Sequence, residues 1–492
     1  MPGCRATRSG PVLRRRFLQQ AGILAGGIVT STTLSLLAAH AAAPSEKREP
    51  QRSGRGADYG ELQRTGDIDG RMILALPKGF QYSTFSKTGD AYGPGLAVPR
   101  NHDGMACFPA VGDTVRLIRN HELRNVPGDF RLGITAPADL QYDALAMGGC
   151  MTLDFDTKRK RLVRQFVSIA GTLVNCAGGW SHRNEGWITC EETTFGMRQG
   201  YAKPHGYSFL VPASADSTVP AVPLKALGRF VKEAAVADDG GVVYQTEDAA
   251  DSSGFYRFTP DKPGDLRSGR LQMLAIRGRP GAELYQRTAA GARLPVAWVD
   301  IGTPDPDLEN GAASVFSQGR ARGGAAFNRL EGIFRGVDGR SIYFVSTGGG
   351  EKRAPGGKGY GQLWRYVPAE PPTRGSDELV LVFESPSGSV LESPDNLCIT
   401  PSGGMLLCED DAIADGDTHA LGGRITDVNR LIGIGPGGAP FAFAVNILNA
   451  TEFAGACFSP DGETLFVNIY GDATHGSGMT CAIWGPWDRG PL

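Results

Sequence analysis

Acidic or thiol side chains recur along this chain in pairs, and about 14 to 19 residues separate the two members of each pair. Each pair brackets an apolar stretch of hairpin length, so equivalent hairpins would bring all of these groups to one end of a repeated unit. So many anionic groups can share a small space only if cations neutralise them. The pattern therefore predicts a centre of several metal ions. The candidate ligands are Cys176, Glu191, Glu192, Glu233, Glu247, Asp248, Glu331, Asp395, Glu409 and Asp410.

The donor types of this set indicate which metals it would hold. Carboxylate oxygens suit hard cations such as Ca²⁺, Mn²⁺, Mg²⁺ and Fe³⁺. A site for calcium alone needs no cysteine, whereas Cys176 would suit a transition metal. The mixture favours iron together with calcium. His102 and His121 are candidates for ligands or for residues that support ligands, although an isolated histidine is more often structural.

Arg329 precedes Glu331 by two residues in a predicted strand. Side chains two apart in a strand lie on the same face, so this guanidinium would stand beside a candidate metal ligand. A guanidinium can hold two oxygens of one phosphate group, which makes Arg329 the candidate catalytic residue. The alternative is a salt bridge that only stabilises the strand.

The elements that must position these groups follow from an internal repeat. The second members of the pairs fall near positions 120, 190, 247, 347, 408 and 468, so the period is about 60 residues with one longer step. Short β-type runs bounded by turn residues, 69 glycines and no sustained helical period accompany it. Six such units predict an all-β, six-bladed β-propeller over residues 61–492, with an insertion around residues 261–322. Its innermost strands would bring the acidic positions to one mouth of the central channel.

The first 43 residues are typical of a Tat export signal. Residues 14–18 read Arg-Arg-Arg-Phe-Leu, and a weakly apolar run rich in Ala, Gly and Thr follows. An ordinary Sec signal or an anchor helix is the alternative. Residues 44–60 are polar and predict a disordered lead-in. No later segment has the roughly 18 apolar residues that span a bilayer. We expect a periplasmic or secreted protein that engages the Tat machinery and keeps no membrane anchor.

Composition narrows the possible partners. The net charge of −2 and the pI near 6.4 argue against a nucleic-acid partner. Eight cysteines follow the signal and none forms a Cys-x-x-Cys pair, so a structural zinc site is not expected. Most should be buried core thiols. We expect a monomer with a small-molecule substrate.

The acidic positions lie within a series of short motifs. They are Arg119-Asn-His-Glu122, Asn175-Cys-Ala-Gly-Gly179, Thr189-Cys-Glu-Glu192, Gly228-Arg-Phe230 with Glu233, Thr246-Glu-Asp248, Arg329-Leu-Glu-Gly332, Pro394-Asp-Asn396, Cys408-Glu-Asp410, Ala454-Gly455 with Cys457-Phe-Ser-Pro-Asp-Gly462, and Ala482-Ile-Trp-Gly-Pro-Trp487. Together these motifs resemble the PhoX-type alkaline phosphatase family, and the resemblance covers residues 79–487. It implies a six-bladed propeller that is exported by Tat and hydrolyses phosphate monoesters at a centre of two iron ions, as Fe³⁺, and up to three Ca²⁺.

Carried over by residue, the resemblance implies that Arg329 contacts the substrate phosphate. One departure is Lys232, because larger members usually have a histidine before the residue that matches Glu233; the chain resembles a shorter branch of the family. The implied metal ligands are Cys176, Glu191, Glu192, Glu233 and Glu331, and the implied calcium ligands or supporting residues are Glu247, Asp395 and Glu409.

Two other functions remain open from the sequence. One is a calcium-dependent six-bladed hydrolase of lactones or other esters, whose metal site would need fewer carboxylates and no thiolate. The other is a non-catalytic propeller that binds a protein partner. Metal content separates them, because only the phosphatase hypothesis requires iron.

Overall fold

The computed structural model describes residues 58–127, 133–286, 288–354, 357–369, 376–410, 413 and 415–492. The predicted export signal and nearly all of the predicted lead-in lie outside the described residues. Within them, helix is confined to α3 (Val315–Arg320) and short 3₁₀ turns, and the rest of the regular structure is β-strand. No helix in these ranges is long and apolar enough to span a membrane. The prediction of an all-β protein is confirmed.

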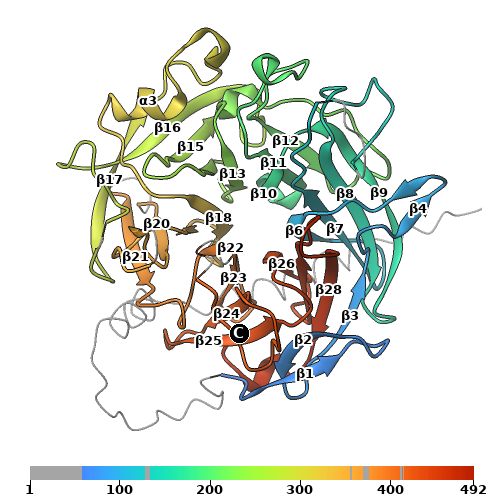
Figure 1. Cartoon of the computed structure of the whole chain (residues 1–492). Coiled ribbons are helices and arrows are strands. Elements are labelled where there is room, and N and C mark those ends of the chain that lie inside the picture. The colour runs from blue at the N-terminus through green and yellow to red at the C-terminus, as the bar shows by residue number, and fades with distance from the viewer. Residues whose placement is uncertain are drawn as a thin grey trace, which may run out of the picture.

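In the described residues, six antiparallel hairpins stand around the centre of the molecule (Figure 1). Each inner strand contacts the next, and the last contacts the first, so the ring closes in the manner of a β-propeller. The inner strands are β6 (His102–Pro109), β10 (Asn175–Trp180), β13 (Lys232–Ala237), β18 (Leu330–Arg335), β22 (Pro394–Ile399) and β26 (Phe453–Phe458). Their partners are β7 (Thr114–His121), β11 (Gly186–Glu191), β14 (Val243–Glu247), β19 (Ile342–Ser346), β23 (Met405–Glu409) and β27 (Thr464–Ile469).

Further strands extend the hairpins outwards into sheets. The outer strands are β8 (Gly148–Asp156), β9 (Arg161–Thr172), β12 (Ser208–Pro212), β15 (Phe255–Pro260), β16 (Gly269–Ile276), β20 (Gln362–Val367), β21 (Glu378–Glu384), β24 (Arg430–Ile434), β25 (Pro440–Asn446) and β28 (Met479–Trp484). Strand β17 (Arg293–Asp300) pairs with both β16 and β21 and so joins two of the sheets. Residues 261–322, expected as an insertion, therefore contribute β16 and β17 to the sheets and also contain α3.

Strands from the start of the chain complete sheets that its end has formed. β3 (Gln81–Phe85) pairs with β28, while β1 (Leu62–Gly66) and β2 (Met72–Pro77) extend the sheet beyond β25. The remaining strands, β4 (Ala91–Gly93) and β5 (Leu96–Ala97), form a separate small hairpin. The buried Tyr82 hydroxyl accepts hydrogen bonds from the backbone N–H groups of Ile73 and Leu74, at 3.0 and 3.2 Å. These bonds tie β2 to β3, and the pairings of β2 with β25 and of β3 with β28 join the start of the chain to its end and keep the ring closed.

Small residues allow the inner strands to approach one another closely at the centre. A Cβ atom at Gly104 would lie 2.6 Å from the Cα of Ala177, and one at Gly332 would lie 2.7 Å from the carbonyl oxygen of Asp395. The side-chain nitrogen of Asn120 donates to the carbonyl oxygens of Cys176 and Ala177, each at 2.8 Å. The strand ends are thus held close together, and the side chains they carry must share one small volume.

Candidate metal centre

Each inner strand leaves its regular pairing near its first residue. In β6, for example, His102 pairs with His121, and the next paired residue is Met105. The same register shift occurs in β10, β13, β18, β22 and β26. A bulge of this kind re-aims a side chain, and such bulges are common beside active sites. In five of the strands, the residue directly after the first paired one is an acid or cysteine: Asp103, Cys176, Glu233, Glu331 and Asp395.

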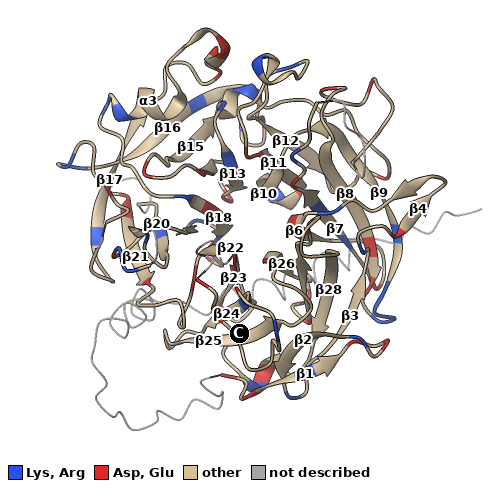
Figure 2. Cartoon of the chain, in the orientation of Figure 1, with Lys and Arg blue, Asp and Glu red and all other residues tan. Residues whose placement is uncertain are grey.

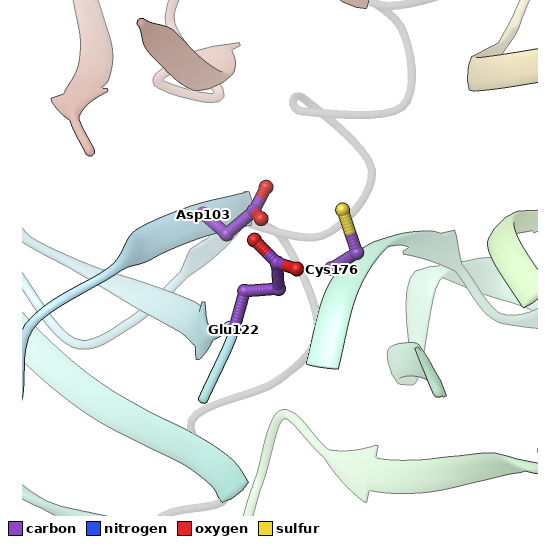
Figure 3. Close-up of side chains that lie close together, drawn as sticks. All are labelled: Asp103, Glu122 and Cys176. Atoms are coloured by element: carbon purple, nitrogen blue, oxygen red, sulfur yellow. The ribbon is translucent and has the colours of Figure 1, made fainter. Parts of the chain in front are cut away.

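These five side chains and four further acids form four groups of three around the inner ends of the hairpins, where acidic residues gather in Figure 2. In each group, one potential ligand atom from every member lies within 4.8 Å of the others. Successive groups share Cys176, Glu233 and Asp395, so the four form one continuous arc. Figure 3 shows Asp103, Glu122 and Cys176 directed toward one another from β6, the end of β7 and β10. The groups are Asp103–Glu122–Cys176, Cys176–Glu192–Glu233, Glu233–Glu331–Asp395 and Asp395–Asp410–Glu452.

Burial and mutual repulsion oppose ionisation of the arc. Burial raises the pKa values of Glu233 and Glu331 well above their ordinary range, and neighbouring carboxylates raise them further. Burial also raises the pKa of Asp395 to about 6 and that of Asp410 to about 7. The pKa of the Cys176 thiol rises well above its usual value for the same reasons, burial first and then Asp103. Cations in the arc would reverse these shifts, because they favour the ionised forms.

Glu233 provides a direct test of whether the arc fits metal ions. It is completely buried, and neither carboxylate oxygen has a hydrogen-bond partner among the residues that the structure describes. A buried carboxylate without donors is costly, and buried polar atoms without partners are rare in folded proteins. Several carboxylates beside one thiol are also the donor set expected for hard cations together with a transition metal. The residues therefore fit a metal centre.

Two arginines contact the arc from its edges. Nη2 of Arg329 lies 2.6 Å from Oε1 of Glu331, and its Nε donates to Oδ1 of Asp248 at 3.3 Å. Glu331 in particular raises the pKa of Arg329, so this guanidinium stays charged. Nη2 of Arg124 lies 2.6 Å from Glu192 and 3.1 Å from Glu122. Arg329 and Glu331 were expected in one strand, but Arg329 lies directly before β18 with a positive φ of 46°, and this turn brings its guanidinium to Glu331.

The family model for alkaline phosphatase PhoX matches residues 57–472. The chain belongs to the PhoX family. Among solved structures, Pseudomonas fluorescens PhoX in complex with vanadate, a transition-state analogue, is 19% identical, and the match covers 89% of this chain and 99% of that one with a TM-score of 0.65. At this identity the likeness shows the fold, and it confirms the predicted β-propeller.

More distant matches include the gluconolactonase XC5397 from Xanthomonas campestris. It is 10% identical, with 88% of this chain and 99% of that chain covered and a TM-score of 0.40. A calcium-binding protein, regucalcin, from Agrobacterium tumefaciens is also 10% identical, with 83% and 98% covered and a TM-score of 0.38. A search of curated proteins found no match to the chain.

The structure brings five of the eight predicted ligands of this PhoX-family chain into the arc and leaves three outside it. Glu191, Glu247 and Glu409 are the paired residues at the ends of β11, β14 and β23, and each accepts hydrogen bonds within its own sheet or the adjoining loops. Glu191 accepts from the backbone N–H groups of residues 173 and 206, and Glu247 from the Tyr256 hydroxyl. The five in the arc are Cys176, Glu192, Glu233, Glu331 and Asp395.

Arg430 is the partner of Glu409, to which its Nε donates at 2.7 Å. Burial raises the pKa of Glu409 to about 7, although Arg430 lowers it. Like Glu191 and Glu247, Glu409 holds the hairpin end in place and lies outside the four groups of candidate ligands.

Four members of the arc were not among the eight predicted ligands. Asp410 belongs to the wider set of candidates, whereas Asp103, Glu122 and Glu452 do not. Glu122 and Asp410 could have been identified from their positions directly after the paired residues His121 and Glu409. Consecutive residues of a strand face opposite sides, so a residue next to a paired one points the other way. Of two successive acids at a hairpin end, the second is therefore the one that reaches the channel.

His102, His121 and Lys232 lie outside the arc. Burial lowers the pKa values of both histidines well below their usual range, so both are neutral. Lys232 is the position at which the sequence departs from the resemblance. Its Nζ donates to the carbonyl oxygen of Leu227 at 3.0 Å and lies 3.7 Å from the centroid of the Phe230 ring. As the partner of Glu247 in the ladder, Lys232 faces away from the channel.

His205 anchors the hairpin that carries Glu192. Its Nδ1 lies 2.6 Å from Glu191 and its Nε2 3.4 Å from Asp143, and all three side chains are completely buried. Burial lowers the pKa of His205, but Glu191 and Asp143 outweigh it and raise the pKa to about 9. This imidazolium therefore neutralises two buried carboxylates.

Replacing His205 with alanine is expected to destabilise the protein by about 3–5 kcal/mol, because two buried carboxylates lose their cation. The contribution of His205 is fully present below its unfolded pKa of about 6.5 and is lost as the pH rises through about 9. Urea denaturation at pH 6 and pH 10 measures both effects. The exposed His475 with its Asp472 partner is the control, and His475→Ala should cost less than about 1 kcal/mol. Equal losses for the two variants at pH 6 would contradict the assignment.

Proposed function

We propose that this chain is an exported phosphatase that hydrolyses phosphate monoesters at a centre of two iron ions and up to three calcium ions. Its membership of the alkaline phosphatase PhoX family supports the reaction. The observation that carries the metal centre is the arc of four ligand groups, with the unpartnered carboxylate of Glu233 shared between two of them.

The donor types suggest how the ions would be distributed. Cys176 belongs to the two groups that contain a thiol, and we assign iron to them because a thiolate suits a transition metal. The groups around Asp395 offer only carboxylate oxygens, which suit calcium. When bound, the ions would supply Lewis acidity toward the phosphoryl group. The acids of the arc would hold them, and the surrounding hairpins would keep the arc rigid.

Arg329 would bind the phosphoryl group of the substrate. Its Nε and Nη2 already contact Asp248 and Glu331, which fixes the plane of the guanidinium. Its Nη1 makes no hydrogen bond within the described residues, and the side chain is 24% exposed, so donors remain for an incoming oxyanion. A fixed, charged donor at this place would stabilise the negative charge of the transferring group.

Residues 1–43 would carry the chain across the inner membrane through the Tat machinery. This route transports folded proteins, so it is compatible with a protein that acquires its metals before export. The eight cysteines within the described residues are all free and buried, and the fold thus has no disulfide there that would need an oxidising compartment. We expect the mature protein to act as a monomer in the periplasm or outside the cell.

Metal analysis combined with a hydrolysis assay tests this function. We expect about two iron ions per chain together with calcium, and hydrolysis of p-nitrophenyl phosphate that a chelator abolishes and added Ca²⁺ with iron restores. Calcium without iron, with hydrolysis of a lactone but not of the phosphate ester, would support a lactonase instead. A protein that binds neither metal and hydrolyses neither substrate would support a binding propeller.

A further inference from the structure

A cavity of about 380 Å³ opens beside the arc. Three segments form most of its wall, which Met147 completes: the approach to β6, the residues that follow β7, and the loop that follows β27. Glu122 lines this cavity and also belongs to the group with Asp103 and Cys176, so the cavity borders the candidate metal centre. Its volume lies in the range of pockets that bind small molecules.

Most of the charged side chains that line this cavity are already paired. Glu122 lies 3.1 Å from Nη2 of Arg124 and accepts a hydrogen bond from the Tyr470 hydroxyl. Arg124 also contacts Glu192. Asp472 accepts from the backbone N–H of Thr474 at 2.7 Å and lies 2.9 Å from Nδ1 of His475.

Arg100 is the exception. It lines the cavity and is half-buried, and its guanidinium has no ion pair or hydrogen bond within the part of the chain that the structure describes. Arg100 is therefore the one charged side chain of the cavity lining that has no partner of opposite charge among the described residues. A guanidinium presents a planar set of donors that can hold a carboxylate or a phosphate through two parallel hydrogen bonds.

We propose that this cavity binds the alcohol portion of the substrate and that Arg100 selects alcohols with an anionic substituent. The inference rests on the proposed function, because it requires the phosphoryl group to lie at the adjacent arc. A phosphate monoester at Arg329 and the metal ligands would extend its alcohol past Glu122 into the cavity. A carboxylate or a second phosphate on that alcohol would then meet Arg100. The preferred substrates are thus small phosphate monoesters with a second anionic group.

Two pairs of substrates that differ in this one group test the proposal. 3-Phosphoglycerate has a carboxylate where glycerol 3-phosphate has an alcohol, and fructose 1,6-bisphosphate has a second phosphate that fructose 6-phosphate lacks. The wild-type protein should have the higher kcat/KM for the anionic member of at least one pair, and the pair that shows the preference identifies the anion. Arg100→Gln should lower that preference about tenfold, which corresponds to about 1.4 kcal/mol. Arg100→Lys should keep part of it.

Arg279→Gln is the matched control, because it removes one positive charge from an exposed turn outside the cavity. It should leave the preference as in the wild type. The proposal is overturned if the wild type shows no preference in either pair, or if Arg100→Gln changes both members of a pair equally. If the wild type hydrolyses none of these esters, the proposed function fails. In that case calorimetry of 3-phosphoglycerate binding to the wild type and to Arg100→Gln tests the subsite separately. Equal affinities of the two proteins would exclude a role of Arg100 in binding the anion.

Discussion

Replacing Cys176 with alanine is expected to lower kcat/KM for p-nitrophenyl phosphate by roughly 100-fold or more, together with loss of bound iron. Cys176 belongs to two of the four ligand groups, so its removal affects the arc at a shared point. The local fold should persist, because Asn120 binds the carbonyl oxygen of residue 176 rather than its side chain. Steady-state kinetics, elemental analysis and circular dichroism on the same preparation measure the three effects.

Cys190 provides the matched control for this experiment. Its thiol is also buried in the same hairpin, but it lies near the Ser208 hydroxyl and outside every ligand group. Cys190→Ala should retain both iron and activity, with the modest loss of stability expected for a buried truncation. A Cys176→Ala protein that keeps its iron and full turnover would disprove the proposed metal centre.

Replacing Arg329 with glutamine should lower kcat/KM by about 10²- to 10³-fold while the metal content remains as in the wild type. The guanidinium donates toward the place where the phosphoryl group would lie, and glutamine removes both its charge and its paired donors. The inhibition constant of inorganic phosphate should rise in parallel. This second measurement separates a role in phosphate binding from a purely structural one.

Arg335 offers the control for Arg329, since it lies at the other end of β18 and pairs with Asp239 at 2.9 Å. Arg335→Gln should leave phosphate inhibition and kcat/KM within about twofold of the wild type. If Arg329 only stabilises its strand, Arg329→Gln will lower the unfolding midpoint and leave phosphate inhibition unchanged. That outcome would remove Arg329 from the proposed site.

The regular spacing of acids along the chain was sufficient to predict an all-β propeller and a shared anionic centre. Hairpin length and strand alternation are local properties, so Cys176, Glu233 and Glu331 could be placed together from sequence alone. The resemblance to the PhoX family agrees with the family match. The ion pair of Arg329 with Glu331 does not follow from strand alternation, because Arg329 lies directly before β18 with a positive φ of 46°.

What the sequence did not settle was which acid of each adjacent pair reaches the channel. Glu191 and Glu192, or Glu409 and Asp410, are chemically alike, and their faces depend on the register of the hairpin. The bulges at the inner strand ends set that register, and they reflect how closely six strands can approach around one axis.

The sequence by itself determined the residue types, their period and hence the kind of centre that this chain can build. Only the tertiary structure decided which residues form the centre, because Asp103, Glu122 and Glu452 join the arc through contacts between hairpins that lie far apart in the chain. The cavity beside Glu122 arises in the same way, since its walls come from the first and the last hairpin. Closure of the ring brings these segments together, and no local sequence pattern encodes a contact between residues so far apart in the chain.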